Sequence, residues 1–152
     1  MTTYTDEIKR LFIDTSAWIA LMNKKEQHYA AALTFHQSLD PSTIRITSWG
    51  VVAETFTWIL YHIGQREASR WLDLKDALEK QGILQVVFPD YQMEARVRRV
   101  LGRYHDQTLS YVDAFSIAII QSRLDIDAIF AFDHHMALAG IPILPGLLNS
   151  KK

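Results

Sequence analysis

Two aspartates directly follow apolar segments that are too short to be helices. Residues 11–13 (Leu-Phe-Ile) lead into Asp14, and residues 128–132 (Ala-Ile-Phe-Ala-Phe) lead into Asp133. Short apolar runs of this kind predict buried strands. Because ligands of open α/β sheets bind at the carboxyl ends of the strands, both carboxylates are candidates for a binding site. Asp14 could instead only cap the helix that follows it, since aspartate is a favoured N-cap residue.

Two further acidic residues interrupt segments that are otherwise apolar. Glu54 lies in a predicted helix over residues 49–62, and Asp113 lies near the start of a predicted helix over residues 110–120. A helix that is apolar on all sides is buried, and a buried glutamate is costly unless it is paired, protonated or bound to a metal. No lysine or arginine lies three or four positions from Glu54. The alternatives are that Glu54 projects from a solvent-facing edge of its helix and that Asp113 only completes a Ser-x-x-acid capping box.

Strands and helices alternate along the chain. The predicted strands cover residues 11–13, 44–47, 83–88, 128–132 and 141–144, and helices occupy the segments between them. This alternation predicts a parallel sheet covered by helices on both faces. Pro142 lacks an amide donor, so the last strand is expected at an edge of the sheet. With 152 residues, the chain is expected to form a single domain over residues 1–152.

Composition limits the classes of protein and of metal site. Hydrophobic residues make up 49% and charged residues 22% of the chain, as in an ordinary soluble globular protein. The absence of cysteine excludes disulfides and thiolate metal sites, and no His-Glu-x-x-His zinc motif occurs; we expect His134 and His135 to form a solvated first helical turn. With a net charge of -1, any nucleic-acid partner must meet a local basic patch. Neither a signal peptide nor a membrane span is predicted, so we expect a cytoplasmic protein.

The four acidic residues are expected to meet at one edge of the predicted sheet. The carboxyl ends of parallel strands, and the starts of the helices that follow them, lie on the same side, which places Asp14 and Asp133 near Glu54 and Asp113. Two carboxylates about 4 Å apart repel each other by roughly 4 kcal/mol, so such a cluster must bind a cation or take up protons. Oxygen ligands favour hard ions such as Mg²⁺ or Mn²⁺. These ions polarise phosphoryl groups and generate hydroxide from bound water.

Four sequence motifs together resemble those of PIN-domain nucleases. They are Phe-Ile-Asp14-Thr-Ser-Ala-Trp, Val-Ala-Glu54-Thr, Leu-Ser-Tyr-Val-Asp113-Ala-Phe and Phe-Asp133-His-His-Met. In particular, the chain resembles the VapC-type toxins of bacterial and archaeal toxin–antitoxin pairs, over nearly its whole length. The resemblance implies a three-layer α/β/α sandwich with a parallel, doubly wound sheet, and a metal-dependent ribonuclease that uses one or two Mg²⁺ or Mn²⁺ ions.

The resemblance also implies roles for individual residues. Asp14, Glu54 and Asp113 match the three core metal-binding acids of the family, and Asp133 matches a more variable fourth acid that often acts through water. Ser16 matches a small polar residue that helps to hold the geometry of the site. Two features depart from the family pattern: Met136 stands where many relatives have an aromatic residue, and the chain is a little long for a compact toxin.

Substrate and partners are predicted in less detail. An acidic site needs basic residues at its rim to attract the RNA backbone, although any one of them could belong to an ordinary solvated face; the candidates are Lys24, Lys25, Arg96, Arg99 and Arg103. The resemblance implies a homodimer and a small antitoxin. Trp58, Tyr61 and Trp71 could supply apolar interface area or pack in the core. The alternative functions are a PIN-domain nuclease in RNA processing outside a toxin–antitoxin pair, a signalling receiver domain and a catalytically silent binding module.

Overall fold

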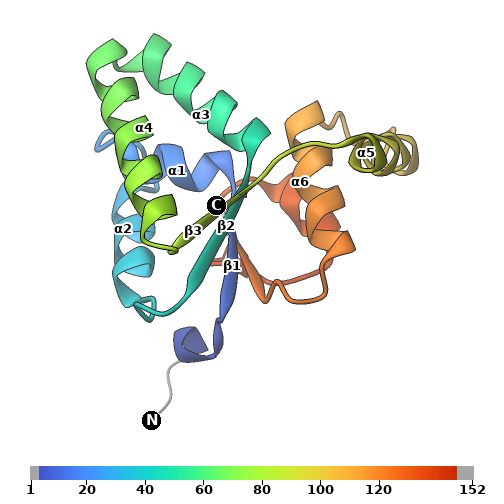
Figure 1. The fold of residues 1–152 in the computed structure, drawn as a ribbon, viewed down its shortest axis with the longest axis horizontal. Helices are drawn as coiled ribbons and strands as arrows, with labels where there is room; N and C mark the ends of the chain where they lie inside the picture. Colours follow the sequence, from blue (N-terminus) through green and yellow to red (C-terminus); the bar gives the residue numbers. More distant parts are fainter. Residues whose placement is uncertain (1–3, 147–152) are drawn as a thin grey trace, which may run out of the picture.

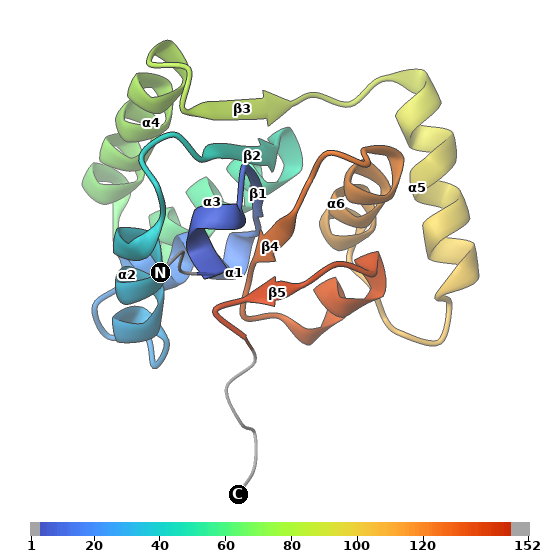
Figure 2. The same cartoon turned by 90° about the horizontal axis from the view of Figure 1, so that it is seen from below.

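A parallel sheet lies at the centre of the computed structural model, which describes residues 4–146. In the spatial order β3-β2-β1-β4-β5, five strands form this sheet (Figure 2). They are β1 (Arg10–Ile13), β2 (Ile44–Ser48), β3 (Leu84–Val87), β4 (Ala128–Phe130) and β5 (Ile143–Leu144). The prediction of a parallel α/β sheet is confirmed, and β5, which begins directly after Pro142, lies at an edge of the sheet as predicted.

Helices cover both faces of the sheet. The α-helices are α1 (Thr15–Met22), α2 (Tyr29–Ser38), α3 (Trp49–His62), α4 (Gln65–Lys80), α5 (Tyr91–Arg103) and α6 (Tyr111–Ser122). Two short 3-10 helices, η1 (Tyr4–Glu7) and η2 (His134–Ala139), complete the set of described helices. Figure 1 shows α1, α2 and α4 on one side of the sheet and α5 and α6 on the other. Among residues 4–146, no helix has the length and hydropathy that a membrane crossing requires.

The direction of winding reverses next to the central strand. From β1 the chain moves outward through β2 to β3, and then returns through α5 and α6 to β4 on the other side of β1. In the ladder, Phe12 lies opposite Ile46 on one side and Ile129 on the other, and all three side chains are fully buried. In doubly wound sheets, the crevice outside the strand ends at such a reversal is where ligands bind. The gap between the ends of β1 and β4 is therefore the place to look for a site.

Two details differ from the sequence predictions. Strand β4 ends at Phe130 and does not reach Asp133, because the Phe132 amide donates to the Ser16 hydroxyl (2.9 Å) and leaves the ladder. Trp71 is fully buried, with its ring centroid 5.7 Å from that of Trp18, so the interface role considered for it is wrong and the core alternative is correct. On α4 the sequence alone could not separate these two roles, because both need an apolar residue.

Candidate metal centre

Asp14 lies at the carboxyl end of β1, where its amide donates to the Phe130 carbonyl (3.1 Å) of the neighbouring strand. It is the N-cap of α1, and its Oδ2 accepts hydrogen bonds from the Ser16 amide (3.4 Å) and hydroxyl (2.8 Å). Its Oδ1 is buried without a hydrogen-bond partner. Burial, together with the negative charges of Asp113 and Asp133, outweighs the Ser16 hydrogen bonds and raises the pKa of Asp14 to about 7. Asp14 therefore both caps a helix and keeps one buried oxygen free.

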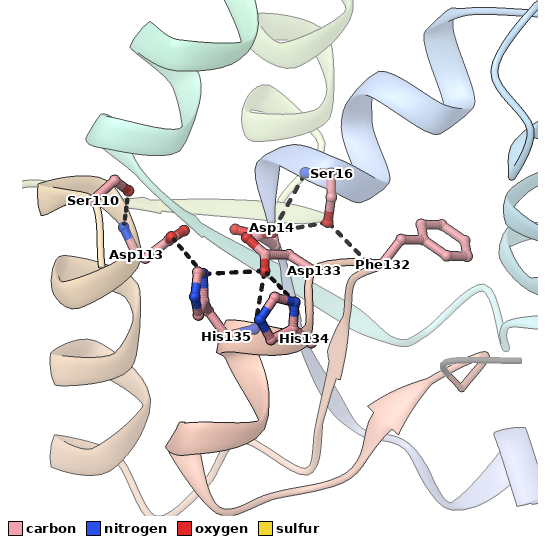
Figure 3. A network of polar contacts seen from close by, with 8 residues as sticks. All are labelled: Asp14, Ser16, Ser110, Asp113, Phe132, Asp133, His134 and His135. Carbon is pink, nitrogen blue, oxygen red and sulfur yellow. Dashed lines mark hydrogen bonds and ion pairs between the residues drawn. The ribbon is translucent and has the colours of Figure 1, made fainter. Parts of the chain in front are cut away.

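Ser16 connects the two halves of the site. Its hydroxyl donates to Asp14 and accepts from the Phe132 amide, so it joins the start of α1 to the segment that follows β4 (Figure 3). The two segments are 116 positions apart in the sequence. Ser16 therefore links the Asp14 carboxylate to the backbone of the residue that precedes Asp133.

Asp113 and Asp133 approach each other from α6 and η2. The Asp113 amide donates to Ser110 Oγ (3.1 Å), so Ser110 caps α6 as predicted, while the Asp113 carboxylate faces the other acids (Figure 3). Burial raises the pKa of Asp113, and the negative charge of Asp133 raises it further. Asp133 is the N-cap of η2 and accepts a hydrogen bond from the His135 amide (2.9 Å). The capping and site roles of Asp113 thus coexist.

His135 belongs to the cluster, although the sequence analysis placed it in a solvated turn. Its Nδ1 lies 3.4 Å from Asp133 Oδ1 and 3.7 Å from Asp113 Oδ2, and only 21% of its side chain is exposed. His134, by contrast, has an exposed side-chain fraction of 76%, as expected. The usable signal was the spacing: His135 follows Asp133 by two positions, as Ser16 follows Asp14, and both residues donate their amides to the aspartate.

Glu54 lies beside this group on α3 and is half-buried. Burial raises its pKa, and the negative charges of Asp113 and Asp133 raise it further, so Glu54 belongs to the same electrostatic cluster. The tightest group of potential ligand atoms, all within 4.8 Å of one another, comprises Asp113, Asp133 and His135. The structure therefore brings all four predicted acids to one edge, with Asp14 and Glu54 flanking a compact trio.

The residues of this cluster fit a divalent cation. Within the described range 4–146, the cluster carboxylates form ion pairs only with histidine, so no lysine or arginine neutralises their charge. The unpartnered Asp14 Oδ1 is a buried acceptor of the kind that an ion would satisfy. Carboxylate oxygens with one imidazole nitrogen form a donor set suited to hard or borderline divalent ions.

The predicted basic residues lie away from the acids. Lys24 and Lys25 are exposed in the connection between α1 and α2. Three arginines of α5 line a groove of about 440 Å³ with the last turn of α6; this arginine groove comprises Arg96, Arg99, Val100, Arg103, Ala118, Gln121 and Ser122. Because Gln121 follows Asp113 by eight positions on α6, the helical rise separates the two by roughly 12 Å. The arginine groove and the acidic cluster are thus distinct regions.

A second groove, of about 600 Å³, lies between α3 and the start of α6. Its walls are mostly apolar, and three of its aromatic side chains are strongly exposed: Trp49 (50%), Tyr61 (78%) and Tyr111 (54%). Trp58 also lines this apolar groove, and Glu54 stands at its border with the acidic cluster. Of the aromatic residues considered for an interface, Trp58 and Tyr61 therefore line a groove at the surface.

Comparison with known proteins agrees with this geometry. The chain is 28% identical to the 23S rRNA-specific endonuclease VapC20 of Mycobacterium tuberculosis over 130 residues, which cover 86% of this chain and 94% of the relative. The crystal structure of that protein, described as a sarcin–ricin loop cleaving toxin, superposes with a TM-score of 0.72 over 86% of this chain and 95% of that one. FitAcB from Neisseria gonorrhoeae shares the fold (TM-score 0.59, 14% identity, 88% of this chain and 95% of that chain covered).

The resemblance that was inferred from the four acidic motifs is also confirmed by a family model. The model for the PIN domain matches residues 11–141, from the first buried strand to the segment after η2. This span contains the acidic cluster and the strands that position it. The chain therefore belongs to the PIN domain family.

Proposed function

We propose that this protein is a divalent-metal-dependent endoribonuclease that acts as the toxin of a VapBC-type toxin–antitoxin pair. The main support is the unpartnered Asp14 oxygen inside an acidic cluster at the strand reversal. The relationship to VapC20, a ribosomal-RNA endonuclease, supports RNA as the substrate. The proposal treats residues 1–152 as one domain and places it in the cytoplasm, a reducing compartment compatible with a chain without cysteine.

The cluster residues have complementary roles in this proposal. Asp14, Glu54, Asp113 and Asp133 hold one or two Mg²⁺ or Mn²⁺ ions, and Ser16 keeps the Asp14 carboxylate turned toward the others. Once bound, a divalent ion would polarise the phosphodiester and lower the pKa of the attacking water. No side chain of the cluster has to form a covalent bond to the RNA.

RNA has to be attracted by residues outside the cluster. The carboxylates repel phosphates, whereas the arginine groove presents three exposed guanidinium groups along one helix face. Arginine forks bind phosphate oxygens well, and each contact releases a counterion from the RNA. In this proposal Arg96, Arg99 and Arg103 hold the backbone of the RNA at a distance from the cleaved bond, and Lys24 and Lys25 add a weaker attraction.

The apolar groove supports a homodimer, and the toxin assignment implies a small antitoxin as a further partner. Exposed aromatic side chains are enriched at protein interfaces, and the walls of this groove contain few polar groups. Tyr61→Arg should convert the dimer to a monomer in sedimentation experiments, because it puts a charge into the contact. Leu124→Arg, at a fully exposed residue outside the groove, is the matched control. A wild-type protein that is monomeric at high concentration would contradict the dimer.

Cleavage of RNA by one carboxylate variant and its matched control tests the activity. Asp40-Pro-Ser42 repeats the bonding of Asp14-Thr-Ser16, since the Ser42 amide (2.8 Å) and hydroxyl (2.6 Å) donate to Asp40, but it lies in an exposed turn away from the cluster. With Mg²⁺ or Mn²⁺, the wild-type protein and Asp40→Asn should cut an RNA that carries a sarcin–ricin loop. Folded Asp113→Asn should not, and EDTA should stop the reaction. Full activity of Asp113→Asn, or activity in EDTA, would refute the proposal.

A further inference from the structure

His135 occupies a position that the acidic motifs do not explain. Its ring lies between the Asp113 and Asp133 carboxylates, with Nδ1 at 3.7 Å and 3.4 Å from their nearest oxygens (Figure 3). These separations are longer than those of charge-assisted N–H···O hydrogen bonds, which are roughly 2.7–2.9 Å. They lie between the roughly 3 Å that separates two ligands at right angles and the roughly 4.2 Å that separates opposite ligands on one ion with bonds of about 2.1 Å. The spacing therefore fits three ligands around a shared ion better than a histidine hydrogen-bonded to two acids.

The backbone holds His135 in this position. Its amide donates to Asp133 Oδ1 (2.9 Å), so the turn that presents the ring is capped by a carboxylate of the cluster. A second observation points to a ligand at the same place: Asp14 is 98% buried, with a relative exposure of 2%, and its Oδ1 has no partner. The neighbouring His134 has the same type of side chain, but that side chain is mostly exposed to solvent. Position, and not residue type, thus distinguishes the two histidines.

The type of donor atom limits which ion is preferred. Mg²⁺ binds oxygen ligands and keeps much of its water shell, whereas imidazole nitrogen is a common ligand of first-row transition ions. We propose that His135 is a nitrogen ligand of the divalent ion and makes the centre selective for Mn²⁺ over Mg²⁺. This inference rests on the proposed function, because it takes the acidic cluster to be the ion site.

The main alternative has the opposite consequence. A His135 side chain that serves as an internal cation between Asp113 and Asp133 would compete with a metal ion for the two carboxylates. Its removal would then strengthen metal binding, whereas removal of a ligand weakens it. The sign of the change in Mn²⁺ affinity therefore separates the two roles.

Electron paramagnetic resonance of the full-length protein loaded with Mn²⁺ tests this assignment. Wild-type protein should bind Mn²⁺ at least about ten-fold more tightly than Mg²⁺, and its pulsed spectrum should show coupling to an imidazole nitrogen. In His135→Ala and His135→Gln the nitrogen coupling should disappear and the Mn²⁺ affinity should fall by about ten-fold or more, as in metal sites that lose supporting groups. The affinity for Mg²⁺ should fall less, and the control His134→Ala should resemble wild type in all three measurements.

Three outcomes would overturn the inference: nitrogen coupling that persists in folded His135→Ala, coupling that is absent from wild type, or Mn²⁺ affinity that is unchanged or increased in both variants. Each of these can occur while RNA cleavage still depends on a divalent ion and on Asp113, and the proposed function then stands without the histidine. Loss of the proposed function would instead appear as wild-type protein that binds ions and cuts no RNA.

Discussion

The two ends of helix α6 differ in what holds their functional side chains. At its start, Asp113 is buried, its amide is capped by Ser110, and its carboxylate meets groups from η2 and from the end of β1. At its last turn, the arginine groove is formed by long, exposed side chains of α5, and none of its arginines has an ion pair among residues 4–146. The acidic side chains are held in place by the sheet and the helix caps, whereas the exposed arginine side chains are free to change conformation.

This difference assigns the two tasks of the proposed nuclease, bond cleavage and RNA attraction, to two separate regions of the fold. Bond cleavage needs groups held to within a fraction of an ångström, and the ends of buried strands and capped helices provide this. Attraction of a flexible polyanion needs charge more than exact position, and exposed arginines provide that at low cost to the fold. Changes in the acidic cluster should therefore abolish cleavage, whereas changes in the arginine groove should alter RNA affinity in a graded, salt-dependent way.

The largest effect is expected for Asp14→Asn, which should lower cleavage by more than about 100-fold while stabilising the metal-free fold. The pKa of Asp14 rises from 3.8 to about 7 on folding, so between these pH values the folded state holds a proton that the unfolded state has lost. The contribution of Asp14 to the free energy of unfolding is therefore largest below about pH 4, falls as the pH rises, and levels off above about pH 7. At pH 8 the variant should be more stable than wild type by up to about 4 kcal/mol.

Urea unfolding in EDTA at pH 5 and pH 8 measures this stability difference. Asp40→Asn is the control, because Asp40 is exposed and its pKa is lowered by the Ser42 hydrogen bonds instead of raised by burial. Saturating Mn²⁺ should restore stability to the wild-type protein and not to Asp14→Asn. Equal pH dependence of unfolding in wild type and Asp14→Asn would show that folding does not raise the pKa of Asp14.

An intermediate effect is expected for Ser16→Ala, which leaves every carboxylate in place. The variant loses the hydroxyl that donates to Asp14 and accepts from the Phe132 amide. By analogy with supporting groups of metal sites, metal affinity or cleavage should fall by about 10- to 100-fold. Ser42→Ala, in the equivalent exposed motif, should cleave as wild type does. Unchanged cleavage by Ser16→Ala would mean that the cluster does not need this link.

A smaller, salt-dependent effect is expected when Arg96, Arg99 and Arg103 are all replaced by alanine. RNA affinity should fall, and the slope of log affinity against log salt should decrease by about 2 to 3, since each phosphate contact contributes about 0.7–0.9. Cleavage at saturating RNA should stay within about two-fold of wild type, because the groove is separate from the cluster. Arg98→Ala is the control on the same helix, since Arg98 is exposed and does not line the groove. An equal loss of RNA affinity in Arg98→Ala would show that the overall positive charge of α5, and not the arginine groove, attracts the RNA.

The smallest effect is expected for the double change of Lys24 and Lys25 to alanine. Both residues are exposed in a loop and neither lines the acidic or arginine region. RNA affinity measured by filter binding at low salt should fall by about two- to three-fold, and the difference should vanish at high salt because long-range attraction is screened. An effect as large as that of the arginine changes would assign the main RNA contact to this loop instead.

Much of this arrangement could be predicted from the sequence because it depends on periodicity and strand ends. The short apolar runs before Asp14 and Asp133 predicted two buried strands, which the structure places side by side, and the alternation of elements predicted the edge where the acids meet. The spacing between Asp133 and His135 could have marked His135 as a neighbour of the acids, but the direction of its ring depends on the turn that Asp133 caps and follows from no local pattern. The early end of β4 depends on the Ser16 hydroxyl, a contact between distant segments that no local pattern contains.

The hydrogen bond between Ser16 and the Phe132 amide joins segments 116 positions apart, and this has a consequence for synthesis of the chain. A ribosome adds about 5–20 residues per second, so roughly 6–24 s pass between the incorporation of Asp14 and that of Asp133. Throughout that interval the nascent protein carries only part of its acidic cluster. The complete acidic cluster can therefore form only after Asp133 and the strand that precedes it have been synthesised.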